Sequence, residues 1–239
     1  RNALGSNTTA SSNTAVGHSA LGANTTGTSN VAVGYQALDA NTTASNNTAV
    51  GRAALAENTT GSNNVAVGAL DSNTTANNNT AVGNNALGAN TTGISNTAFG
   101  RGSLSVSTTA SYNTAIGQAS LIANTSGSQN AAVGHDSLND NTSGDFNIAV
   151  GSNALAKNTT GDSNTALGTA SLVSNTTASN NTAVGRSALN LNTTGTENTA
   201  VGAFALDSNT TANYITAIGY NALSNNTTGN QNTAVGRSA

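Results

Sequence analysis

The chain of 239 residues contains no cysteine, proline, methionine or tryptophan, and only four tyrosines and three phenylalanines. Without cysteine it can form neither a disulfide-stapled scaffold nor a metal site built on thiolates. Charged residues make up 6% of the sequence, against roughly 25% in an ordinary soluble domain. Binding of nucleic acid needs clustered lysine and arginine. A formal net charge of −3 without any run of basic residues therefore argues against a nucleic-acid partner.

The sequence also lacks a run of about 18 apolar residues, so we expect no membrane span. Low charge with abundant asparagine, threonine and serine occurs in disordered polar tracts. Here, however, the sequence repeats: NTAVGHSALGANTTGTS (13–29) is followed by NVAVGYQALDANTTASN (30–46). New copies begin at residues 13, 30, 47, 64, 79, 96, 113, 130, 147, 164, 181, 198, 215 and 232. Such strict periodicity indicates a repeat architecture rather than disorder.

All full copies have the same length except the one at 64–78, which is shorter because it lacks a pair of residues after Gly68. Numbered from its first residue, the repeat always has alanine at position 3, glycine at position 5, a bulky apolar residue at position 4 and leucine at position 9. These apolar positions do not follow helical spacing, and threonine and valine favour strands. We therefore predict an all-β fold: a parallel β-solenoid, or β-roll, of fourteen 17-residue repeats. Residues 1–239 are expected to form a single continuous repeat array.

A second, weaker period is visible at position 15, where alanine and glycine alternate along most of the chain. The series Ala10, Gly27, Ala44 and Gly61 illustrates it. Either a 34-residue unit was duplicated, or this double repeat is itself the physical coil. Because stacked strands lie about 4.8 Å apart, the two alternatives differ twofold in the length of the array.

Alternate residues of a strand point to opposite faces, so positions 3 and 4 should differ in environment. We expect position 4 and position 9 to fill the core, including Val16, Leu21, Val33, Leu38, Val50, Leu55, Val133, Leu138, Val184 and Leu189. Position 3 would then face outward, although it never becomes polar. We therefore predict that this alanine column packs against another copy of the chain, through Ala15, Ala32, Ala49, Ala66, Ala132 and Ala183.

The motifs NTAVG (13–17), NVAVG (30–34) and NTAIG (113–117) resemble the head repeats of trimeric autotransporter adhesins. The stretch ITAIGYNALSNNTTGNQNTAVG (215–236) is also similar to repeats of bacterial and phage fibre proteins that end in an endosialidase-type chaperone domain. The resemblance spans the whole chain. It implies a left-handed β-roll of three chains, although the adhesin repeat is shorter than the repeat of this chain.

Residues with catalytic or metal-binding chemistry are sparse. His18 and His135 both occupy position 6 but lie seven repeats apart, too far to share a metal. No pair of acidic residues recurs as acid–base catalysis would require, and no Ser-His-Asp arrangement can be identified. We therefore predict no catalytic, cofactor-binding or metal-binding residues, and no enzymatic activity. Position 6 varies freely and carries Tyr35, Arg186 and Tyr220 among others, as expected of a solvent-facing or ligand-facing stripe.

Position 12 begins a glycosylation motif, Asn-Thr-Thr or Asn-Thr-Ser, in nearly every copy. The alternative is a turn, which asparagine also favours. Glycans could be carried by Asn24, Asn58, Asn90, Asn158, Asn192 and Asn226.

Together these features predict a structural or adhesive fibre segment, part of a longer protein on a bacterial surface or a phage. It would assemble with itself as a homotrimer or filament, and a host-surface glycan or protein could be a partner. The alternative is an ice-binding or glycan-binding solenoid. An ice-binding face needs threonine at alternate positions of one strand. The two threonines of Asn-Thr-Thr are adjacent, and position 2 is not always threonine.

Overall fold

The computed structural model describes residues 2–239, and strands are the regular secondary structure that these residues form. The chain is divided into two compact units, residues 1–113 and 114–239. Each full repeat contributes one short strand, positions 2 to 4. The first unit holds β1 (Thr14–Val16), β2 (Val31–Val33), β3 (Thr48–Val50), β4 (Val65–Val67), β5 (Thr80–Val82) and β6 (Thr97–Phe99). The second holds β7 (Thr114–Ile116), β8 (Ala131–Val133), β9 (Ile148–Val150), β10 (Thr165–Leu167), β11 (Thr182–Val184), β12 (Thr199–Val201), β13 (Thr216–Ile218) and β14 (Thr233–Val235).

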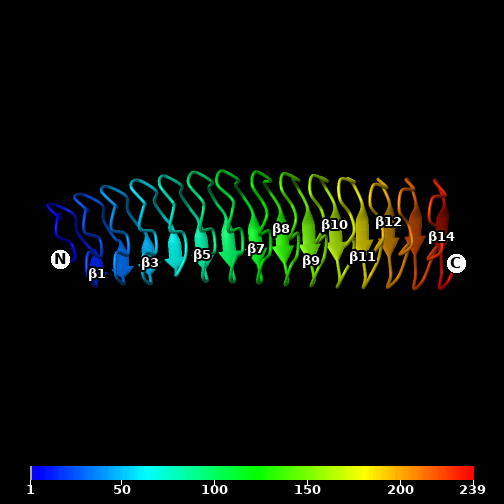
Figure 1. Ribbon diagram of the computed structural model, residues 1–239, viewed down its shortest axis with the longest axis horizontal. Coiled ribbons are helices and arrows are strands. Elements are labelled where there is room, and N and C mark those ends of the chain that lie inside the picture. Colours follow the sequence, from blue (N-terminus) through cyan, green and yellow to red (C-terminus); the bar gives the residue numbers. More distant parts are fainter. Residues whose placement is uncertain (1) are drawn as a thin grey trace. The chain divides into compact units, whose positions relative to one another are not determined.

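Within each unit the strands are parallel and pair in chain order (Figure 1). Each strand residue pairs with the residue at the same repeat position in the next copy, as Ala32 does with Ala49. This register confirms the predicted parallel β-solenoid and shows that one copy of the repeat makes one coil. The alternative, in which two copies share a coil, is wrong.

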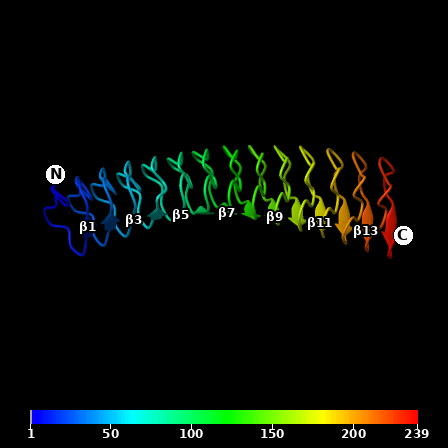
Figure 2. The same cartoon turned by 60° about the horizontal axis from the view of Figure 1, so that its bottom comes forward.

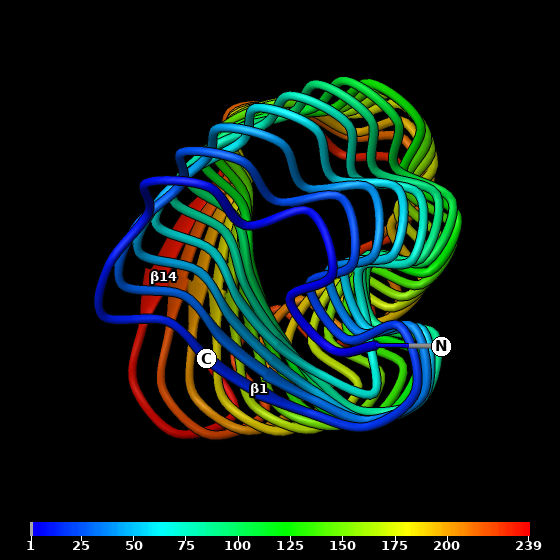
Figure 3. The same ribbon diagram turned by 90° about the vertical axis from the view of Figure 1, so that its left-hand side faces the viewer.

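The strands are short because left-handed residues turn the chain several times in each coil. Ser19, Leu21 and Ser29 have φ angles of 57°, 54° and 58°, and the same repeat positions (7, 9 and 17) are left-handed in the other full coils. Between these corners, backbone hydrogen bonds still connect consecutive coils. The N–H of Leu21, for example, donates to the carbonyl of Ala37 at 2.9 Å. Figure 2 shows the coils from the side, and Figure 3, which looks along the stack, shows that the backbone of each coil closes around an interior.

Leucine at position 9 fills that interior, as predicted. Leu21, Leu38, Leu55, Leu138 and Leu189 are all fully buried. A leucine at positive φ is unfavourable by itself, so burial of its side chain and the stacked backbone bonds must offset the strain. This column is the apolar spine of both units.

The prediction that position 4 belongs to the core is wrong. Val16 and Val50 are 57% and 37% exposed, and Val33, Val133 and Val184 are only partly buried. Position 3, which is alanine in every copy, and position 1, which is asparagine except for Ile215, point inward instead. The leucine of position 9 and the columns of positions 1 and 12 occupy most of the interior, and position 3 adds only a methyl group.

The predicted assembly face is wrong for the same reason. The alanines of position 3 lie inside their own coil, so they offer no surface to another chain. Ala32, Ala49, Ala66, Ala132 and Ala183 have no exposed surface, and Ala15, in the strand β1, is partly buried.

Two columns of buried asparagine form hydrogen-bond ladders through the interior. At position 12, Asn41 donates from Nδ2 to Oδ1 of Asn24 at 2.9 Å and to the carbonyl of Ala44 at 3.1 Å. At position 1, Asn30 donates from Nδ2 to the same carbonyl at 2.9 Å, and its N–H donates to Oδ1 of Asn13. A buried amide without partners destabilises a fold, whereas each of these bonds contributes about 0.5–1.5 kcal/mol net.

The second period at position 15 reflects packing of one column rather than coil length. Ala178 and Ala212 are buried on either side of Gly195. A Cβ on Gly195 would lie 2.5 Å from Oδ1 of Asn192 and would also collide with the carbonyl of Ala212. At position 15, therefore, the methyl group of an alanine fits where the neighbouring coils carry glycine.

The short fourth copy lacks positions 6 and 7, which form a corner. Its strand β4 still pairs in register with β3 and β5, and Leu70 remains fully buried. The backbone adjusts to the missing residues at Gly68, whose φ is 62°. The glycines at the same position of the preceding and following copies, Gly51 and Gly83, have φ angles of 122° and 126°. The core therefore depends on the columns and not on the full corner.

Candidate functional site

The outward-facing residues of the strands form the most uniform surface of each unit. This outer strand face comprises repeat positions 2 and 4. Position 2 is threonine in most strands and otherwise valine, alanine or isoleucine, while position 4 is always valine, isoleucine, leucine or phenylalanine. The exposed fractions of Val16, Phe99 and Leu167 reach 57%, 56% and 46%. No strand among residues 2–239 carries a charged residue on this face.

The corner that follows each strand shows how an unconstrained surface of this chain varies. Position 6 carries arginine, histidine, tyrosine, asparagine, glutamine, serine, threonine and alanine in different copies. Since exposed apolar patches generally mark sites of interaction, the outer strand face is the first candidate for a binding surface. The two-residue alternation of the strands was the sequence signal for this face, but the sequence alone predicts that position 4 points inward, and the structure shows that it points outward.

The structure contradicts the predicted glycan sites. Asn24, Asn58, Asn90, Asn158 and Asn192 are fully buried. Their Nδ2 atoms, to which an N-linked glycan would have to be attached, donate within the ladder. Asn226 is only partly buried, but its Nδ2 donates in the same way to the carbonyl of Gly229 at 3.1 Å. The recurrent Asn-Thr-Thr pattern of this chain is thus a core and turn motif.

The second candidate surface lies on the corners after β11 to β14, at positions 6 and 7. Arg186 lies over the ring of Phe204, with 4.5 Å from Cζ to the ring centroid. Phe204 meets Tyr220 edge to face at 6.1 Å between centroids, and Arg237 lies 5.8 Å from the centroid of Tyr220. The corresponding corners of the first unit bring His18 and Tyr35 into a stacked pair at 5.3 Å. Sequence reasoning had identified the variable position 6 but not these contacts.

The histidines lie on separate corners of the coils. His18 stacks on Tyr35, and His135 lies 3.1 Å from a carboxylate oxygen of Asp136, from Nδ1 to Oδ2. Within residues 2–239, no group of three histidine or acidic side chains is placed to hold a metal ion.

Two carboxyl groups have shifted pKa values. Burial raises the pKa of Asp71, and the neighbouring carboxylate of Glu57 raises it further, while Arg52 acts in the opposite direction. Burial likewise raises the pKa of Asp207, against hydrogen bonds from its own N–H and from Ser208. Both residues occupy position 10, next to the core leucine, which explains the desolvation.

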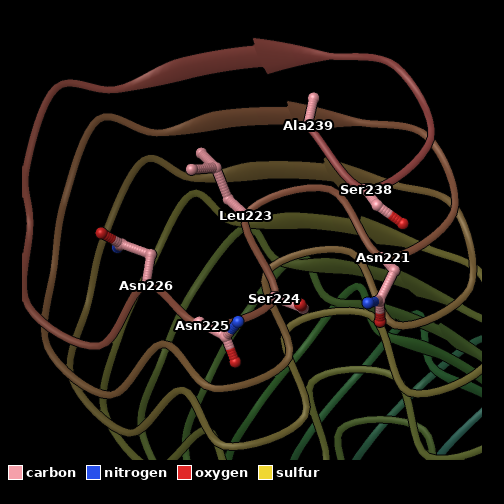
Figure 4. A pocket seen from close by; sticks show the side chains of 7 residues that line it. All are labelled: Asn221, Leu223, Ser224, Asn225, Asn226, Ser238 and Ala239. Carbon is pink, nitrogen blue, oxygen red and sulfur yellow. The ribbon is translucent and has the colours of Figure 1, made fainter.

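Two hollows border the corners of the coils. One, of about 340 Å³, is bordered by Leu223, Asn226 and Ala239 together with neighbouring polar residues (Figure 4). The other includes Asn2, Gly5 and Gly22. The first hollow combines the leucine and asparagine columns of positions 9 and 12 with corner residues, whereas the second is lined by positions 7, 10 and 11, which lie at the corners of the coils.

Residues 2–239 include no helix of the length and hydrophobicity required to traverse a lipid bilayer. Comparison with models of known protein families finds no match to this chain, and no curated protein matches it either.

Proposed function

We propose that this chain is a structural, adhesive segment of an extracellular fibre, on a bacterial surface or a phage, that assembles with copies of itself and performs no catalysis. The observation that carries the proposal is the outer strand face, which is uncharged and at least partly exposed in the strands of both units. The alanine column cannot serve this purpose, because it is already buried inside each coil. The contact between copies is therefore assigned to positions 2 and 4.

The size of this face is sufficient for association. Burying a whole valine-sized side chain contributes about 1.5–3 kcal/mol, and position 4 of the second unit ranges from partly buried at Val133 to 68% exposed at Val235. Since a third to a half of each side chain is then free to be buried, the strands β7 to β14 would contribute roughly 4–10 kcal/mol from position 4 alone. This is comparable with the cost of association, about 4–15 kcal/mol, and position 2 adds to the gain. The resemblance to trimeric adhesin heads favours three copies around a common axis.

The test is the mass of the protein in solution and its response to charge on the outer strand face. The chain has a mass of 23.2 kDa, and we expect sedimentation equilibrium to give three times this value. The double variant Val184→Asp/Val201→Asp should be monomeric, because assembly would bury unpaired carboxylates. The matched control is Thr194→Asp/Thr211→Asp, exposed positions of the same two coils, which should assemble normally. Circular dichroism should show unchanged β-structure in both variants.

A monomeric wild-type protein, or a face variant that assembles like the wild type, would contradict self-association. One specific observation favours a second candidate, ice binding. In most strands a threonine at position 2 projects from the same side as the apolar residue at position 4, which supplies one of the two alternate threonines that such a face requires. Phe99, Ile148 and Leu167 interrupt the regular pattern, and position 4 never carries a hydroxyl group. A monomeric wild type that produces thermal hysteresis would establish this alternative.

A further inference from the structure

The corners after β11 to β14 carry a continuous line of side chains, Arg186, Phe204, Tyr220 and Arg237, called here the Arg–aromatic ridge. Each member contacts the next: guanidinium over ring at 4.5 Å, ring against ring at 6.1 Å, and ring beneath guanidinium at 5.8 Å. Tyr220 is 51% exposed, both arginines are exposed, and Phe204 is half-buried. The ridge is thus a stacked apolar strip with a cation at each end.

Within residues 2–239, no carboxylate neutralises the charges of the ridge. The ion pair found within residues 2–239 joins His135 and Asp136, and neither Arg186 nor Arg237 lies within ion-pair distance of a carboxylate in that part of the chain. A guanidinium offers several N–H donors in a planar fork that matches a carboxylate. The N–H groups of both guanidinium groups therefore remain available to an anionic ligand. Cation–π stacking on Phe204 and Tyr220 holds the two guanidinium groups in place.

We propose that the Arg–aromatic ridge binds an acidic oligosaccharide, such as one containing uronic or sialic acids. The C–H face of a sugar ring packs on an exposed aromatic side chain, and a sugar carboxylate accepts hydrogen bonds from a guanidinium. Arg186 and Arg237 are three coils apart, about 14 Å at ~4.8 Å per coil, with Phe204 and Tyr220 between them. This arrangement suits an extended chain whose acid groups are separated by neutral sugar surface. An acidic oligosaccharide would be the ligand of the proposed adhesive segment, so this inference rests on the proposed function.

A nucleic acid fits the ridge less well, although single strands also stack on aromatic side chains. A nucleic-acid strand in a duplex carries about one phosphate per 3.4 Å, whereas the ridge offers two cations over about 14 Å. The net charge of −3 would repel such a dense polyanion. An oligosaccharide with widely spaced acid groups matches the spacing of the two arginines and is repelled less by the net negative charge of the protein.

The equivalent corners of the first unit provide an internal comparison. His18 and Tyr35 stack there, and the next coil carries Arg52. The charge of Arg52, however, acts on the carboxyl group of Asp71 and opposes the rise in its pKa. Since this arginine already has an acidic neighbour, we expect the first unit to bind an acidic sugar more weakly than the ridge.

Isothermal titration calorimetry of the full chain with an oligogalacturonate tests the proposal, with the methyl-esterified oligomer as the uncharged control. Binding of the acid form should weaken with salt, and the ester should bind at least about tenfold more weakly, since charge-assisted bonds are lost. Arg186→Gln/Arg237→Gln should reduce affinity by a similar factor or more, and Tyr220→Ala should reduce it as well. Tyr214→Ala is the matched control, because Tyr214 is 55% exposed and has no arginine contact among residues 2–239.

Equal binding of the acid and the ester, or wild-type affinity in the double arginine variant, would overturn the proposal. Tighter binding of an oligothymidylate of similar length would also overturn it in favour of single-stranded nucleic acid. The same titration with Val184→Asp/Val201→Asp separates the two proposals. If that variant is monomeric but still binds, the ridge acts independently of assembly. If the wild type assembles but does not bind, the ridge assignment fails and the assembly proposal stands.

Discussion

Replacing Ser107 by asparagine should stabilise the protein. Ser107 stands where the other full copies have asparagine at position 12. It is fully buried, and its Oγ has no hydrogen-bond partner; neither has the Oδ1 of Asn90 in the preceding coil. The backbone at Ser107 follows the column, because its N–H donates to the carbonyl of Leu104 as that of Asn90 does to Leu87. An asparagine would therefore enter a site already shaped for it.

The expected gain follows from the intact part of the ladder. Asn90 donates from Nδ2 to Oδ1 of Asn73 at 3.0 Å and to the carbonyl of Gly93 at 3.1 Å. By analogy, the new Nδ2 would donate to Asn90 Oδ1 and to the carbonyl of Ala110. Relieving one buried, unsatisfied polar atom is worth about 1–3 kcal/mol. For a chain of this size, each kcal/mol raises the melting temperature by about 2–4 °C.

Urea unfolding followed by circular dichroism measures the change in global stability. Amide hydrogen exchange measures the change in stability of individual coils. The exchange data are needed because repeat arrays can open locally. Protection should increase in the coil around Ser107. Thr109→Asn, at an exposed position of the same coil, should change stability by less than about 0.5 kcal/mol. A neutral or destabilising Ser107→Asn would refute the view that the asparagine column is a stabilising ladder.

Three further predictions concern the core, the turns and pH. Leu121→Ala should cost about 2–5 kcal/mol in urea unfolding because it leaves a cavity, whereas Gln118→Asp on the exposed corner should be nearly silent; equal losses would mean that the faces are wrongly assigned. Gly134→Ala should strongly lower the melting temperature, since its Cβ would lie 2.5 Å from the next coil's carbonyl oxygen, while Gly68→Ala meets nothing within 4 Å; similar effects would count against close coil packing. Asp71 has a raised pKa, so the folded state favours the protonated carboxyl group. The protonated group therefore stabilises the fold below the ordinary pKa of 3.8, and this stabilisation is lost as the pH rises through the folded pKa. Asp71→Asn should therefore be more stable than wild type at pH 7 in thermal melts, with the difference shrinking as the pH approaches 3; a pH-independent difference would exclude this cause.

Much of the fold follows from the sequence because identical columns can only stack in register. The repeat period predicted a stack of coils but left open whether one or two copies make each coil, and the invariant Leu38 marked the core. The inward side of the strand was also encoded, although it was misjudged. Asn30, Ala32 and Gly34 alternate with Val31 and Val33, and the positions of the first three are nearly invariant across the copies. Hydrophobicity pointed to the valines, but the limited interior volume selects the smaller side chains.

Other features depend on packing that a single sequence does not display. The left-handed conformation of Leu21, with φ of 54°, contradicts local preference and is imposed by the closed coil. The burial of Asn24 could not be distinguished from an exposed glycosylation motif until the ladder was seen. The contact between Arg186 and Phe204 joins positions 6 and 7 of consecutive coils, a relation that column-by-column reading does not reveal.

The central claim is that copies of this chain meet through the outer strand face, and site-specific crosslinking tests it most directly. Because the chain has no cysteine, single cysteines can be introduced without interference. Under mild oxidation, Val184→Cys should form disulfide-linked dimers, since the same positions of neighbouring copies would lie close together. Thr194→Cys, exposed on the same coil, should remain largely monomeric on a non-reducing gel. Equal crosslinking at the two positions, or none at Val184→Cys in a protein that sediments as an oligomer, would contradict the assignment.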